Sequence, residues 1–111
     1  MKRGDVFLAN LEPTQGAQTQ KTRPVVIVSN DAANRVAALV TVLPITSNVS
    51  RIFPFEVKLL AADTGLSKGS KAMAQQVRTL DKGRLAKSVA GHVPANLMLQ
   101  VDAALRLHLS L

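Results

Sequence analysis

Several side chains in this sequence are of the types that bind phosphates and nucleobases. They comprise four cations, a group of hydroxyls and amides, and one aromatic ring: Lys21, Arg23, Arg51, Arg78; Thr46, Ser47, Asn48, Gln75, Gln76; Phe53. Cations bind phosphates, amides read base edges, and an aromatic ring stacks on an unpaired base. Together these side chains would form a surface suited to single-stranded nucleic acid.

Short apolar segments predict the strands that must position these side chains. The pattern favours strands, one helical turn, and a final helix that starts at Pro94. The strands are expected over 6–11, 25–28, 37–43, 53–59, 71–80 and 86–93, and the turn over 32–35. Pro24 is expected at a strand's first residue or at an edge, and Pro44 is expected to end a strand. The fold class is therefore mainly β with a C-terminal helix.

Antiparallel pairing of neighbouring strands predicts that the polar side chains meet. A turn centred near residues 33–34 would set Arg23 near Pro44 and Thr46 opposite Lys21. A hairpin centred near residue 16 would bring Asn10 and Leu11 to the same end.

A third hairpin, centred near residue 65, would set Phe53 and Phe55 opposite Gln75 and Val77. One rim of the sheet is then expected to hold the loop 12–22, with Gln18 and Gln20, together with the cations, hydroxyls, amides and aromatic ring named above.

The final helix carries two apolar rows. Leu97, Val101, Leu105 and Leu109 recur at four-residue steps and are expected in the core. Leu99, Ala103 and Leu107 form a second row, which a partner subunit could cover. The apolar end of the helix is expected to be packed.

Composition indicates one small basic domain over residues 1–111. Apolar residues make up 47% of the chain, enough for a packed interior, which excludes disordered and low-complexity classes. A net charge of +7 suits a polyanionic partner, although solubility alone could also explain it.

Several classes of site and location are excluded or disfavoured. The sequence has no cysteine, so disulfides, thiolate catalysis and cysteine-bound zinc are excluded. The first residues lack the apolar centre of a signal peptide or a membrane span, so we expect a cytoplasmic protein. The rim holds no histidine and no carboxylate cluster for Mg²⁺, so no metal or cofactor is expected there.

RNA cleavage is a reaction that such a rim could perform without a metal. The 2′-hydroxyl is an internal nucleophile, so the protein must supply in-line positioning and stabilise charge on the phosphorane. A guanidinium forms bidentate hydrogen bonds to two phosphoryl oxygens and keeps its charge. A threonine hydroxyl can donate one further hydrogen bond. Arg23 is a poor general base because a guanidinium holds its proton too tightly to act as one.

Short motifs in order along the chain resemble the MazF/PemK toxin family. They are Gly4-Asp5-Val6, Pro13-Thr14-Gln15-Gly16, the run from Lys21 to Asn30, the run from Val42 to Ser47, Pro54-Phe55-Glu56-Val57 and the run from Gln76 to Asp81. The resemblance implies a PemK-like, SH3-like antiparallel β-barrel acting as a homodimer. It also implies metal-free, sequence-specific cleavage of single-stranded RNA, leaving 2′,3′-cyclic phosphate and 5′-hydroxyl ends.

The resemblance also implies roles for particular residues. The family's catalytic arginine and hydroxyl fall on Arg23 and Thr46, two residues that the rim already contained. Nine further side chains of the rim become candidate RNA contacts: Gln18, Gln20, Lys21, Ser47, Asn48, Arg51, Phe53, Gln76, Arg78. A cognate MazE-like antitoxin with a disordered acidic tail fits the basic charge.

One departure concerns the loop glycine. Many relatives carry an acidic residue two positions after it, where this chain has Gln18. Because an amide cannot accept a proton as a carboxylate does, the general base is left open.

Structural readings of the same residues stay open as well. Arg23 could be an ordinary strand-start cation, Thr46 a turn cap, and Phe53 a cover for the barrel mouth. His92 and His108 are expected to be non-catalytic. A toxin of the same build that acts on a protein such as DNA gyrase, or a non-catalytic RNA-binding module, are the alternative functions.

Overall fold

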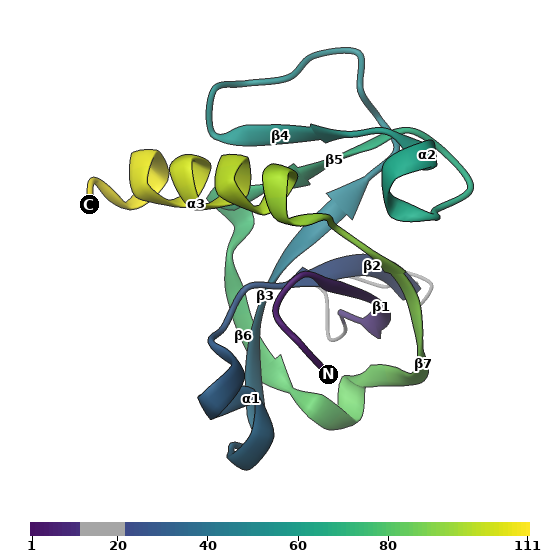
Figure 1. The fold of residues 1–111 in the computed structure, drawn as a ribbon, viewed down its shortest axis with the longest axis vertical. Helices are drawn as coiled ribbons and strands as arrows, with labels where there is room; N and C mark the ends of the chain where they lie inside the picture. Colours follow the sequence, from purple (N-terminus) through teal and green to yellow (C-terminus); the bar gives the residue numbers. More distant parts are fainter. Residues whose placement is uncertain (12–21) are drawn as a thin grey trace, which may run out of the picture.

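The computed structural model describes residues 1–11 and 22–111 and confirms the predicted class, a mostly antiparallel β fold with a C-terminal helix (Figure 1). Its strands are β1 (Asp5–Asn10), β2 (Thr22–Ile27), β3 (Leu39–Thr46), β4 (Glu56–Leu59), β5 (Ser70–Met73), β6 (Arg78–Asp81) and β7 (Leu85–His92). Its helices are α1 (Asp31–Val36), α2 (Ala61–Thr64) and α3 (Ala95–Leu109), with the short 3-10 turns η1 (Ala74–Gln76) and η2 (Lys82–Arg84).

Strand β3 organises the sheet, whose order is β4-β5-β3-β2-β1-β7. One edge of β3 pairs with β2, and the other edge pairs first with β6 and then with β5. The pairing with β6 ends at Val42, and the pairing with β5 begins at Ile45. Pro44 lies in this gap, where a missing N–H costs no ladder bond to β5 or β6. The prediction that Pro44 ends the strand was therefore wrong, and β3 continues to Thr46.

The first predicted hairpin has the expected register. Strands β1 and β2 pair from Val6↔Val26 to Asn10↔Thr22, which centres the connection on residue 16. Pro24 lies inside β2, paired with Leu8 of β1 and one residue beyond the last β2–β3 pair, so it occupies a local edge.

The other two predicted registers were displaced. Between β2 and β3, Pro44 pairs with Val25 and not, as was predicted, with Arg23. The register is therefore displaced by two residues. Helix α1 occupies the connection and lengthens the turn.

Between β4 and β5 the pairs run from Glu56↔Met73 to Leu59↔Ser70, one residue away from the predicted register. The amide N–H of Ala74 consequently bonds the carbonyl of Phe55, which was expected opposite Gln75. The predicted strand 71–80 is also interrupted, because η1 separates β5 from β6 where their shared partner β3 has its gap.

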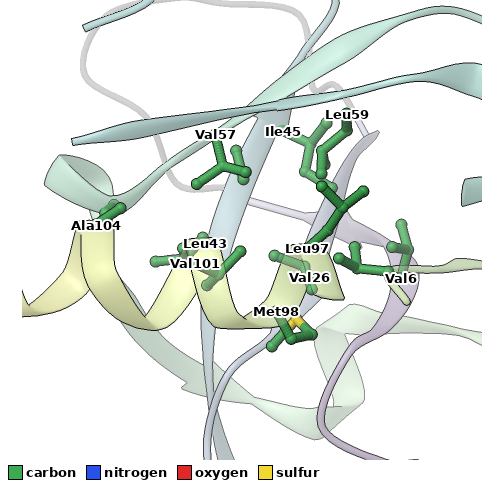
Figure 2. Close-up of a cluster of buried hydrophobic side chains, with 13 residues drawn as sticks. Val6, Val26, Leu43, Ile45, Val57, Leu59, Leu97, Met98, Val101 and Ala104 are labelled. Atoms are coloured by element: carbon green, nitrogen blue, oxygen red, sulfur yellow. The ribbon is translucent and has the colours of Figure 1, made fainter. Parts of the chain in front are cut away.

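Alternation along the strands divides the core into two clusters. Val6, Val26 and Leu43 belong to one cluster, which also takes in side chains of α3 (Figure 2). Phe7, Val25 and Val42, their sequence neighbours, belong to a second cluster on the opposite face of the sheet. The sheet is thus buried on both faces where it carries β2 and β3.

Helix α3 lies across the sheet beneath β4 and β5 in Figure 1. Pro94 is its N-cap, so the helix begins at Ala95, one residue later than predicted. Its buried side chains are Leu97, Met98, Val101 and Ala104. Leu105 is half-buried against the core, but Leu109 is 49% exposed, so the predicted stripe is wrong at its last member.

The end of α3 is exposed as well. Leu107 and Leu111 are exposed, so the expectation of a packed C-terminal end was wrong. Packing of this end therefore does not distinguish a toxin that cleaves RNA from one that acts on a protein. Among the described residues, no helix is long and apolar enough to cross a membrane.

Candidate nucleic-acid interface

Arg23 and Thr46 come together because of the β2–β3 register. Each lies two residues beyond the last pair, Val25↔Pro44, at the end of its strand. Both side chains line the same two pockets, which have volumes of about 460 and 490 Å³. They therefore form a wall that the two pockets share. The predicted rim is right on this pair, although the predicted register had Thr46 opposite Lys21.

The larger pocket, which we call the amide pocket, collects three of the predicted RNA contacts, Asn48, Gln76 and Arg78. Its polar side chains come from β2, β3, the segment after β3, β5, η1 and β6. Its described lining is Leu11, Arg23, Pro44, Thr46, Asn48, Lys71, Met73, Gln76 and Arg78. The smaller pocket, on the other side of the wall, contains Ser47.

The electrostatic character of the two pockets is cationic. No described residue in either lining is an acid, and Arg23 forms no ion pair with a described side chain. A guanidinium without a carboxylate partner can direct its donors to phosphate. In the described part of the chain, no cluster of three His, Asp or Glu residues could hold a metal ion.

The Thr46 hydroxyl has a local structural contact that leaves its proton available. Its Oγ1 accepts a hydrogen bond from the Asn48 amide at 3.2 Å. This is the turn-capping contact of the structural reading. The hydroxyl accepts in that bond, so its own O–H can still donate to a phosphoryl oxygen. The structural and chemical readings of Thr46 are compatible.

A buried ion pair anchors the connection 47–55 between β3 and β4. Lys71 Nζ donates to Glu56 Oε1 at 2.9 Å and to the Arg51 carbonyl at 2.6 Å. Glu56 also accepts from the Phe53 amide at 2.9 Å and from Gln75 Nε2 at 2.6 Å. Burial alone would raise the pKa of Glu56, but the hydrogen bonds from Phe53, Lys71 and Gln75 outweigh it, and the pKa lies below its ordinary value.

Phe53 and Arg51 are not in the described lining of the amide pocket, but both lie near Lys71, which lines it. The Phe53 ring is stacked on Phe55 with centroids 5.4 Å apart, and the Arg51 guanidinium lies 4.9 Å from the Phe53 centroid. The Phe53 residue remains 38% exposed. A base stacking there would meet an aromatic ring that already has two partners.

Three of the predicted contacts, Gln18, Gln20 and Lys21, fall outside the described residues. Gln75, which the predicted rim included, instead bonds the carboxylate of Glu56. Sequence reasoning missed Lys71, whose link to Glu56 runs diagonally across the β4–β5 ladder. A correct hairpin register was the only signal that could have found it.

Both histidines lie outside the two pockets, as expected. His92 Nδ1 lies 3.0 Å from Asp5 Oδ1, and the His108 ring lies near Phe55 with centroids 6.4 Å apart. The fold and the site thus define a small antiparallel β domain whose cationic groove, with no carboxylate among its described lining residues, suits a single strand of nucleic acid.

Comparison with known proteins places the chain in a family. A model of PemK-like, MazF-like toxins of type II toxin–antitoxin systems matches residues 2–109, so this chain belongs to that family. It is 41% identical to Endoribonuclease MazF9 of Mycobacterium tuberculosis (strain ATCC 25618 / H37Rv), covering all of this chain and 98% of the relative. It is 38% identical to Endoribonuclease MazF of Staphylococcus epidermidis, covering all of this chain and 92% of that protein.

Solved structures have the same fold. A mycobacterial endoribonuclease in complex with its cognate antitoxin superposes with a TM-score of 0.81 at 29% identity, over all of this chain and 96% of that one. A MazE-MazF structure from Deinococcus radiodurans gives a TM-score of 0.82 at 27% identity, over all of this chain and 96% of that one.

Proposed function

We propose that this protein cuts single-stranded RNA at the wall formed by Arg23 and Thr46. That it is an endoribonuclease toxin follows from its family and from relatives named as endoribonucleases. The further proposal is the chemistry: the 2′-hydroxyl attacks the adjacent phosphorus, and the 5′-oxygen leaves. The products carry a 2′,3′-cyclic phosphate and a 5′-hydroxyl, and no metal takes part.

Each residue of the pair has a defined task. The Arg23 guanidinium binds two phosphoryl oxygens and stabilises the charge that develops on the phosphorane. The Thr46 hydroxyl donates one more hydrogen bond to the same group. Arg23 neither removes the 2′-proton nor gives up a proton of its own, since deprotonating a guanidinium is too costly. It donates a hydrogen bond to the leaving 5′-oxygen, while solvent takes the 2′-proton and protonates that oxygen.

One observation carries this proposal: the two side chains line both pockets, with no carboxylate in either described lining. A strand that crosses the wall places one phosphate at Arg23 and Thr46 and one nucleotide in each pocket. The described RNA contacts of the amide pocket are then Asn48, Gln76 and Arg78. We propose Ser47, Arg51 and Phe53 as further contacts near the wall, and retain Gln18, Gln20 and Lys21 as contacts from the segment before β2.

Three further features complete the proposal. An antitoxin neutralises the protein, and an acidic tail would suit the cationic groove. Two copies associate through the exposed row Leu99, Ala103 and Leu107 of α3, and the chain 1–111 folds as one domain. The protein acts in the cytoplasm, where its RNA substrates are made.

The decisive experiment incubates the purified protein with a long mixed-sequence RNA in EDTA and maps both ends of every product. We expect discrete cuts with cyclic-phosphate ends. Arg23→Ala and Thr46→Ala should each reduce cleavage by about 100-fold or more, the size of effect seen when one charge-stabilising donor is removed.

Lys58→Ala is a matched control, because Lys58 is exposed on β4 and lines neither pocket. Intact RNA, from protein shown to be folded and free of antitoxin, would overturn the cleavage proposal. Binding without cleavage would indicate an RNA-binding module, and neither binding nor cleavage would favour a protein target.

A further inference from the structure

The smaller pocket has the features of a base-binding site. We propose that it holds the nucleobase next to the scissile phosphate, on the side of the wall away from Gln76 and Arg78, and that Ser70 and Lys68 read that base. This inference rests on the proposed cleavage at Arg23 and Thr46. We call this pocket, of about 460 Å³, the serine pocket. Its volume lies within the usual range for ligand sites.

An unpaired hydroxyl is the first observation that points to a ligand. Ser70, the first residue of β5, lines the serine pocket and is only 4% exposed. Its Oγ is buried and has no hydrogen-bond partner among the residues that the structure describes. Buried polar groups are almost always paired, so an unpaired one needs an explanation. Rotation about the Cα–Cβ bond would turn this hydroxyl towards a base seated in the pocket, which would supply the missing partner.

The apolar walls of the serine pocket suit the two faces of a planar base. Leu8 of β1 and Pro24 of β2 lie in the lining, and Leu66 joins them from the segment after α2. Gly65 ends α2 with a φ of 81°, in the left-handed region, which lets the chain turn there. Leu66 then packs against the core and anchors this segment. The exposed residues Ser67 and Lys68, which follow it, line the pocket.

The polar groups of the serine pocket determine which bases fit. The side chains of the described lining include the Lys68 ammonium and several hydroxyls, but no carboxylate. An ammonium only donates hydrogen bonds. Uracil and guanine present a carbonyl oxygen where cytosine and adenine present an amino group. We therefore expect the serine pocket to prefer uracil or guanine, with Lys68 and Ser70 bonding the carbonyl oxygen.

The experiment first maps the cleavage sequence of the wild-type protein in EDTA. It then measures kcat/KM on four oligoribonucleotides that differ only in the nucleotide 5′ of the cut, and on four that differ only 3′ of it. At one of these two positions, wild type should cleave uracil or guanine at least about tenfold faster than cytosine or adenine, as expected for one good base contact. Ser70→Ala and Lys68→Gln should reduce that preference several-fold and leave the preference at the other position unchanged.

Controls separate base reading from effects on charge or stability. Ser88→Ala and Lys87→Gln remove matching groups from exposed positions on β7 and should leave both preferences unchanged. Because the Ser70 hydroxyl makes no hydrogen bond with any described residue, Ser70→Ala should not lower the unfolding midpoint.

Three outcomes would overturn the serine pocket as a base site. They are a wild-type preference for cytosine or adenine at both positions, unchanged preferences in both pocket variants, and a rate loss in Ser70→Ala that tracks lost stability. If wild type cuts no RNA, the proposed function itself fails, and that result is visible before any variant is made.

Discussion

The Lys71 ammonium lies 2.9 Å from Glu56 Oε1 and 2.6 Å from the Arg51 carbonyl oxygen, so one buried ion pair holds both the β4–β5 hairpin and the connection that follows Thr46. The two side chains are 11% and 2% exposed. Since Lys71 also lines the amide pocket, the fold and the site share this contact.

Removing the charge of Lys71 should destabilise the protein strongly. Lys71→Met leaves the Glu56 carboxylate buried without its cation, and such a change typically costs about 3 to 5 kcal/mol. Urea unfolding measures the loss. Lys58→Met is the control, because Lys58 is the exposed neighbour of Lys71 across the β4–β5 ladder and should change stability by less than about 0.5 kcal/mol. Similar effects of the two variants would show that the ion pair does not support the fold.

The Glu56 carboxylate should make stability depend on pH. Its pKa in the folded protein lies below the ordinary value of 4.5, so its contribution is complete above that value and is lost as the pH falls towards the folded pKa. Between about pH 5 and pH 3, wild type should therefore lose more stability than Glu56→Gln. Urea unfolding at a series of pH values gives the difference between their slopes.

The pKa of Asp31 is also lowered, mainly by a hydrogen bond from the Arg3 amide, and its effect is common to both proteins. Parallel pH profiles would refute the role of Glu56.

Arg23→Lys should show whether Arg23 acts through its geometry or only through its charge. Lysine keeps the positive charge but lacks the planar pair of donors that matches two phosphoryl oxygens. We expect kcat in EDTA to fall by about 100-fold while the affinity for RNA changes by only a few-fold. A variant with nearly full activity would mean that charge alone is sufficient at this position.

Arg78 should contribute to RNA affinity through phosphate binding. It is exposed at the start of β6 and lines the amide pocket. Arg78→Ala, combined with Thr46→Ala to prevent cleavage, should bind RNA more weakly than Thr46→Ala alone. The slope of log K against log salt should fall by about 0.7, the value for one phosphate contact on a single strand. An unchanged slope would assign Arg78 to another role.

The exposed row of α3 should control association. Leu99 and Leu107 are 69% and 54% exposed, which is unusual for leucines of a helix whose other face is in the core. Leu99→Asp with Leu107→Asp should convert a dimer into a folded monomer in sedimentation velocity. Gln100→Asp, an exposed change on the same helix, should leave the dimer intact. A wild-type monomer at micromolar concentration would contradict association through this face.

Local sequence patterns were sufficient for one strand register and for part of the site. The position of Gly16 between two apolar runs predicted the β1–β2 register. Alternation of chain direction was also enough to place Arg23 and Thr46 at one end of the sheet. These features depend on neighbouring residues and on short connections, so they can be read along the chain.

Tertiary structure decided the features that depend on which strands meet. Pro44 is tolerated inside β3 only because β6 and β5 leave a gap beside it, and the interruption at η1 arises at the same place. A one-residue difference in the β4–β5 register decided that Lys71 meets Glu56 and that Gln75 turns to that carboxylate. The unpaired hydroxyl of Ser70 likewise has no local signature, since only the assembled fold determines whether a buried group finds a partner.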